Sequence, residues 1–129
     1  MDDAVLSFFS KMPQALSLFL KLSEKLCSEY PAVSIKIQKT QIAFSDKRNF
    51  ALVWLPIRKM KDRPDVYIII SFFLPYCSNS SRIVQAVEPY PGRWTHHVII
   101  SGESEIDSEL MGLIGESYDF MNRQLSSKS

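Results

Sequence analysis

The sequence is poor in the residues that most often build metal and redox sites. It contains two cysteines and two histidines among 129 residues. A structural zinc site needs about four Cys or His ligands, usually in close pairs. Cys27 and Cys77 are far apart in the sequence and the two histidines are adjacent, so no such ligand set is present. The sequence therefore predicts no metal site and no cofactor.

The short motifs of common enzyme classes are also missing. The chain has no phosphate-binding GxGxxG or P-loop motif and no HExxH sequence. It also has no GxSxG turn, which positions the nucleophile of many hydrolases. Neither histidine is accompanied by a nucleophile or paired carboxylate at a spacing that suits catalysis. We therefore predict no catalytic residue and favour a non-enzymatic function.

The sequence offers neither a membrane span nor a secretory signal. The longest apolar run, Val66–Leu74, is about half the length needed to cross a bilayer. The first residues are acidic, where a signal peptide would be basic. We therefore expect a cytoplasmic protein with no membrane partner and no disulfide. Cys27 falls on the apolar face of a predicted helix and is expected to be a buried thiol.

The composition fits one folded domain with an uneven distribution of charge. Apolar residues make up 46% and charged residues 22% of the chain, as in globular proteins. We expect a single domain over residues 1–129, with its core at about 12–122. Eight basic and two acidic residues give 36–63 a net charge of +6, whereas 103–119 carries six acidic residues and no basic one. These segments are solvated surfaces, mutually attracting elements or a binding face.

Hydrophobic spacing predicts helices at both ends of the chain and strands between them. In 12–29 and from 104 onward, apolar residues recur every three or four positions, and Ser104 suits the N-cap of the second helix. Its expected apolar stripe comprises Ile106, Leu110, Leu113, Ile114, Ser117 and Met121. Six strands are expected near 33–38, 41–45, 49–55, 66–74, 82–88 and 93–101, with a turn at 89–92.

These elements predict an α+β fold, with an antiparallel sheet of about five or six strands and both terminal helices packed on one face. Short connections favour a meander. Both faces of the central strand, 66–74, are apolar. The second face is therefore expected to be partly covered by a loop, by the N-terminus or by a second copy, which would make a homodimer.

The predicted hairpin at 82–101 contains both histidines. Side chains alternate along a strand, so Arg93, Thr95 and His97 share one face and His96 lies on the other. The two imidazoles therefore cannot act as a pair on one ligand. We expect His96 to face the core with a hydrogen bond to backbone or an acid, and His97 to be the better site residue.

Two kinds of binding site remain open. Basic groups neutralise phosphates and aromatic rings stack on bases, so a nucleic-acid surface is one hypothesis. Its expected residues are Arg48, Arg58, Lys59 and Trp94. The other is a pocket for a small anion, because arginine recognises carboxylate and phosphate well. That hypothesis names Lys36, Arg82 and Arg93 as the cations, beside His97.

Several segments together resemble the uncharacterised family called domain of unknown function 5655. They are 39–44, 49–51, 82–84, 91–97, 105–110 and 117–118. The resemblance covers about residues 12–122. It implies a small bacterial or archaeal domain with no agreed activity, and it places the family's recurring polar positions at Lys39, Arg82, Arg93, His97 and Tyr118. Ser117 departs from the alanine that the resemblance leads us to expect.

The sequence thus favours a binding or interaction module with a nucleic acid or a protein as its partner. The alternative is a pocket that binds a nucleotide or carboxylate through Arg, Lys and His on the sheet. In that alternative the ligand-binding residues are Lys36, Lys39, Arg82, Arg93, His97 and Tyr118.

Overall fold

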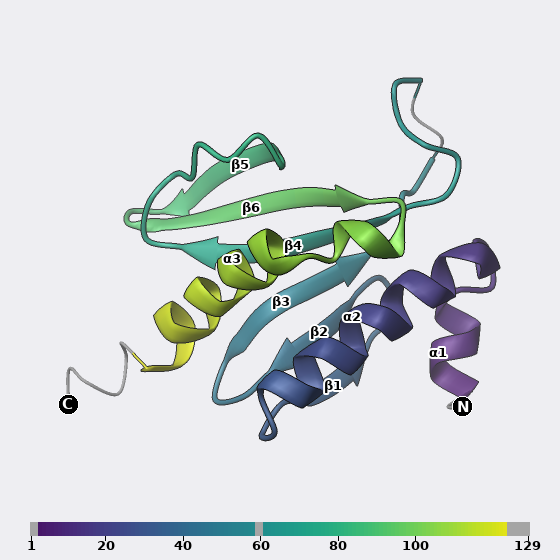
Figure 1. Cartoon of the computed structure of the whole chain (residues 1–129), viewed down its shortest axis with the longest axis horizontal. Helices are drawn as coiled ribbons and strands as arrows, with labels where there is room; N and C mark the ends of the chain where they lie inside the picture. The colour runs from purple at the N-terminus through teal and green to yellow at the C-terminus, as the bar shows by residue number, and fades with distance from the viewer. Residues whose placement is uncertain (1–2, 59–60, 124–129) are drawn as a thin grey trace.

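Six strands form one antiparallel sheet in the computed structural model, which describes residues 3–58 and 61–123. The strands are β1 (Ser34–Ile37), β2 (Ile42–Ser45), β3 (Asn49–Trp54), β4 (Ile68–Leu74), β5 (Ile83–Tyr90) and β6 (Arg93–Ile100). Their spatial order is β1-β2-β3-β4-β6-β5 (Figure 1). The predicted α+β class, the antiparallel pairing and the number of strands are confirmed.

The expected simple meander is wrong at one point, because β6 lies between β4 and β5. His96, Val98 and Ile100 of β6 are fully buried, as suits a strand with a neighbour on each side. Most residues of β5 are exposed, and this strand contains Pro89. Proline cannot donate a backbone hydrogen bond and is tolerated at a sheet edge. The strand β5 also runs to Tyr90, so the turn before β6 is shorter than expected.

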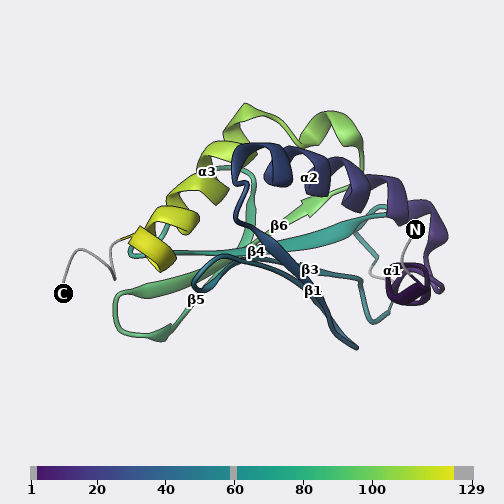
Figure 2. The same ribbon diagram turned by 90° about the horizontal axis from the view of Figure 1, so that it is seen from below.

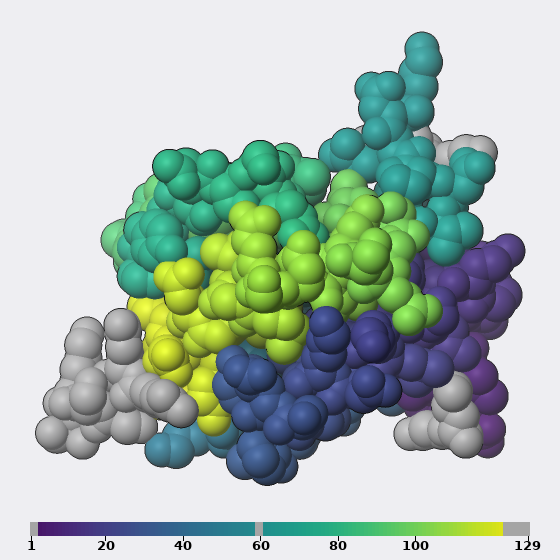
Figure 3. All heavy atoms as spheres, in the orientation of Figure 1, coloured from purple at the N-terminus to yellow at the C-terminus, as the bar shows by residue number. Residues whose placement is uncertain are grey.

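Helices cover one face of this sheet. The three α-helices are α1 (Asp3–Phe8), α2 (Leu16–Glu29) and α3 (Ser108–Tyr118). A 3-10 turn at Pro13–Ala15 precedes α2, another at Glu103–Glu105 precedes α3, and a π turn at Asp119–Arg123 follows α3. Figure 2 shows α2 and α3 on the same side of the strands, as the sequence predicted. From that side the helices hide most of the sheet (Figure 3).

The buried face of α2 does not include Cys27, which the sequence analysis placed on it. Leu18, Leu22 and Leu26 are buried, whereas Leu20 is 40% exposed and Cys27 is exposed. Each helical residue turns the side chain by about 100°, so Cys27 lies a quarter turn away from Leu26. The expectation of a buried Cys27 thiol is therefore wrong, and Cys77 is exposed as well.

The N-cap of the last helix lies three residues after the expected Ser104. Asp107 is the N-cap of α3, and its carboxylate accepts the Leu110 backbone N–H at 3.1 Å. Ile106 is 1% exposed. The turn at 103–105 brings this side chain into the core before the helix begins, which explains why Ser104 is not the cap. The predicted apolar stripe of the helix is confirmed, because all six of its members are buried.

Ser117 joins α3 to the middle of the sheet. Its hydroxyl donates to the Phe50 carbonyl at 2.7 Å and accepts the Phe73 N–H at 2.9 Å. The serine is fully buried, and an alanine there would leave both backbone groups without this partner.

None of the helices in the described residues covers the second face of the sheet (Figure 2). In β4, Ile68, Ile70 and Phe72 lie under the helices, while Ile69 and Ser71 point to the other side. We call this second side the open face. No helix in the described part of the chain is long and apolar enough to span a membrane.

Candidate functional site

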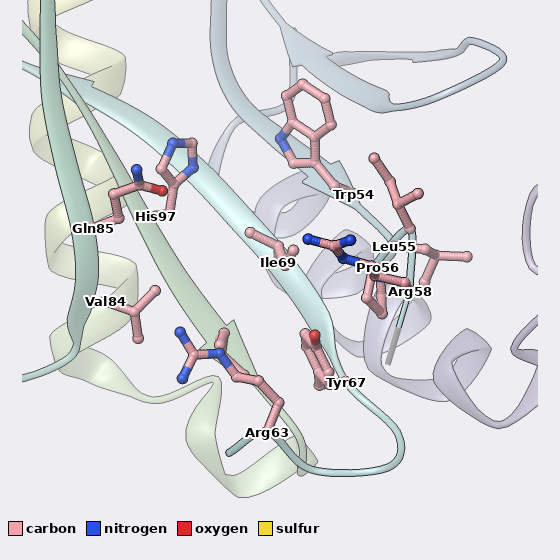
Figure 4. A pocket seen from close by; sticks show the side chains of 12 residues that line it. Trp54, Leu55, Pro56, Arg58, Arg63, Tyr67, Ile69, Val84, Gln85 and His97 are labelled. Atoms are coloured by element: carbon pink, nitrogen blue, oxygen red, sulfur yellow. The ribbon is translucent and has the colours of Figure 1, made fainter. Parts of the chain in front are cut away.

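A hollow of about 380 Å³ lies on the open face. Its floor comes from the central strands, where Ile69 of β4 lies opposite Ile99 of β6. Tyr67 and Trp54 add aromatic surface, and the segment after β3 forms one wall (Figure 4). This volume lies within the usual range of small-molecule sites, and an apolar lining with a few polar groups is typical of them.

A chain of hydrogen bonds crosses three strands beside the hollow. The Trp54 indole N–H donates to Ser71 Oγ at 2.9 Å, and Ser71 Oγ lies 2.6 Å from His97 Nδ1. The strand register produces this row, because Ser71 is the Cα partner of His97 and Trp54 that of Ile69. Sequence alternation correctly predicted that His97 points to the face opposite His96.

The Ser71–His97 contact does not form a catalytic pair of the hydrolase type. Ser71 is fully buried, so its hydroxyl cannot reach a substrate. Such pairs also need a third group that orients the base, and no hydrogen bond joins His97 to an acid within the described residues. Burial lowers the pKa of His97 from its ordinary value, which favours a neutral imidazole at pH 7.

Two arginines supply the charge of the site. Arg58 and Arg63 line the hollow and reach it from different sides, whereas none of the lining residues is acidic (Figure 4). Across the described ranges 3–58 and 61–122, neither guanidinium makes an ion pair. Gln85 of β5 lies next to His97, which is its Cα partner in the sheet. The hollow therefore combines an apolar floor, two available cations and uncharged polar groups.

Arg82 lies elsewhere, in a network that holds the start of α3. Its guanidinium lies 3.0 Å from the Asp107 carboxylate and 3.6 Å from that of Glu109. It also donates to the Glu105 carbonyl at 2.7 Å. The hydrogen bond from the Leu110 backbone N–H, followed by the hydrogen bond and charge of Arg82, lowers the pKa of Asp107. Part of the acidic segment is thus paired with Arg82 rather than with the basic segment.

Tyr118 makes contacts within the fold, on the side of the sheet that the helices cover. Its hydroxyl donates to the carboxylate of Asp46, and its ring stacks on Tyr30 at 4.3 Å between centroids. Both contacts lie on the helix side of the sheet, away from the hollow. A ligand-binding role for Tyr118 stays a prediction.

The remaining predicted residues are spread over the molecule. Arg93 is on the open face but stacks on Phe73 and Tyr90, at 4.9 Å and 5.7 Å from the ring centroids. Trp94 lies on the opposite face of β6, and Lys59 falls outside the described residues. The edge of β1 carries exposed Lys36, which Lys39 follows, and Arg48 is in the β2–β3 turn.

The structure thus places two of the predicted residues, Arg58 and His97, in one hollow. Sequence reasoning missed Arg63 and Gln85 as site residues. Arg63 belongs to the basic segment, and Gln85 could have been found by pairing the two hairpin strands. The segment after β3 and the β5–β6 hairpin are far apart in the sequence. Local sequence patterns therefore could not predict that both line the same hollow.

His96 meets its expectation of a core imidazole bound to the backbone. It is fully buried, its Nε2 accepts the Ser78 N–H at 2.8 Å, and its ring stacks on Phe72. Burial lowers its pKa. Within the described part of the chain, no three His, Cys, Asp or Glu side chains gather where they could hold a metal ion.

The fold and the hollow define a small α+β domain with an open, apolar sheet face. Comparison with family models assigns it further: the chain belongs to the family described as a domain of unknown function (DUF5655), whose model matches residues 5–121. The family resemblance seen in the sequence is confirmed. Comparison with curated proteins gave no match, and comparison with solved structures gave none either.

Proposed function

We propose that this domain is a binding module whose open-face hollow holds a small ligand with a flat apolar part and an anionic group. The observation that carries the proposal is the presence of Arg58 and Arg63, which make no ion pair within the described residues, beside an apolar floor whose lining residues include no acid. Guanidinium groups bind carboxylate and phosphate through paired hydrogen bonds. Trp54 and Ile69 provide the apolar surface for the rest of the ligand.

The geometry supports a small ligand better than a nucleic-acid polymer. Arg48 precedes β3 and Arg58 follows it, so these cations are separated by about 20 Å or more along the strand. Trp94 lies on the face opposite the hollow. The basic residues of the nucleic-acid hypothesis therefore do not follow one track along which a phosphate backbone could lie.

The experiment that tests the proposal measures the melting temperature and binding heat with a panel of flat anions. The panel contains benzoate, indole-3-acetate, adenosine 5′-monophosphate and uridine 5′-monophosphate. A ligand that binds only the folded state raises the melting temperature in a saturable way. We expect at least one of these anions to do so.

Two matched double variants locate the binding. Arg58→Ala with Arg63→Ala removes two positive charges at the hollow, whereas Lys36→Ala with Lys39→Ala removes two from the distant edge of the sheet. The arginine variant should bind at least tenfold more weakly, because each charge-assisted hydrogen bond contributes about 1.5–3 kcal/mol. The lysine variant should bind like the wild type. Absence of binding to every anion, or equal losses in both variants, would contradict the proposal.

A further inference from the structure

The hydrogen-bond chain beside the hollow is compatible with a His97 imidazole that is protonated on Nε2. The Trp54 indole N–H can only donate, so Ser71 Oγ accepts from it. Ser71 Oγ lies 2.6 Å from His97 Nδ1, so its hydroxyl proton can be donated to that nitrogen. In this arrangement the proton of a neutral imidazole is on Nε2. His97 can then offer an N–H donor to a ligand.

Gln85 lies beside that donor and adds a second polar group. The two residues are Cα partners in neighbouring strands, and Figure 4 shows their side chains next to each other at one end of the hollow. A carboxamide provides both an N–H donor and a carbonyl acceptor. Together the two side chains can match a planar heterocycle whose edge carries both donors and acceptors.

The two arginine side chains lie away from Gln85 and His97. Figure 4 places Arg63 at the end opposite His97, and Arg58 on the side of Leu55 and Pro56. Along β4, the four residues from Ser71 to Tyr67 span about 13 Å. The floor between the two ends is apolar. A suitable ligand therefore has a polar flat ring at one end, a spacer, and an anion at the other end.

We infer that the ligand is a nucleoside monophosphate, with its base at Gln85 and His97 and its phosphate at Arg58 and Arg63. This inference rests on the proposed function and narrows it. A nucleotide has a sugar between base and phosphate, which suits the separation of the two polar ends. An aromatic carboxylate carries its anion close to the ring and has no donor and acceptor edge for Gln85 to meet. The two arginines also match the double charge of a phosphate.

Calorimetric titration of the full chain with nucleotide fragments tests this inference. The probes are uridine and adenosine 5′-monophosphates, the two nucleosides, ribose 5-phosphate and indole-3-acetate. We expect at least one nucleotide to bind tenfold or more tightly than its nucleoside, than ribose 5-phosphate and than indole-3-acetate. Tighter binding of indole-3-acetate, still dependent on Arg58 and Arg63, would overturn the nucleotide assignment while leaving the proposed function intact.

Variants of Gln85 distinguish binding of the base from binding of the phosphate. This residue is exposed on an edge strand, so its substitution should not affect folding. Gln85→Leu should weaken the nucleotide by about three- to tenfold, the value of one neutral hydrogen bond, and leave ribose 5-phosphate unaffected. Gln85→Glu should shift the order of preference among bases. Unchanged nucleotide affinity in both variants, or tighter binding of an oligonucleotide than of any mononucleotide, would overturn the inference.

Discussion

At the residue scale, the two adjacent histidines have separate environments because of strand alternation. His96 lies under the helices, where it accepts a backbone hydrogen bond and stacks on Phe72. His97 lies on the open face, tied to Ser71 and through it to Trp54. One imidazole therefore belongs to the core, whereas the other can meet a ligand. Burial lowers the pKa of both.

These lowered pKa values predict how stability depends on pH. In the unfolded chain each imidazole has a pKa of about 6.5, so below that pH the unfolded state binds protons that the folded state resists. The free energy of unfolding should therefore decrease from pH 7.5 to pH 5.5, by at most about 1.4 kcal/mol per pH unit for each histidine. Urea unfolding across this range measures it. His97→Asn, which removes one titrating group, should show a weaker decrease, and a free energy that stays constant in the wild type would contradict the account.

At the element scale, the hollow depends on how helices and edge strands are fixed around the sheet. Ser117 bonds α3 to β3 and β4, which holds the helix over the face opposite the hollow. Arg82, just before β5, forms an ion pair with Asp107, the N-cap of α3. These contacts anchor the hairpin that contains Gln85 and His97. Arg82, which the sequence suggested as a ligand-binding residue, thus holds in place the hairpin that lines the hollow.

The N-cap of α3 provides a stability prediction at this scale. Asp107→Ala removes the cap of the helix and should lower the free energy of unfolding by about 0.5–2 kcal/mol. Asp107→Ser keeps a capping oxygen but loses the ion pair with Arg82, which is partly exposed and should contribute little. Urea unfolding should therefore place the serine variant close to the wild type. Equal losses in both variants would assign the effect to the ion pair instead of the cap.

At the scale of the whole molecule, local patterns predicted the fold better than the site. Alternation and helical spacing gave the six strands, the helix-covered face and the opposite directions of His96 and His97. The spatial position of β6 and the start of α3 were not predicted, because burial of Ile106 and of β6 depends on contacts between distant segments. Arg63 and Gln85 both line the hollow, and they were missed for the same reason. A homodimer through the open face stays a prediction, and such a dimer would cover the hollow.

The central claim is that the hollow on the open face binds flat anions, and two-dimensional ¹H–¹⁵N NMR tests it most directly. The wild-type protein would be titrated with uridine 5′-monophosphate and indole-3-acetate, with the two indole signals assigned from Trp54→Phe and Trp94→Phe variants. We predict saturable shifts at the Trp54 indole and at Ile69, Gln85 and Ile99, with little change at Trp94 or along β1. Shifts centred on Lys36, Lys39 and Arg48, or no shifts with either anion, would contradict the claim.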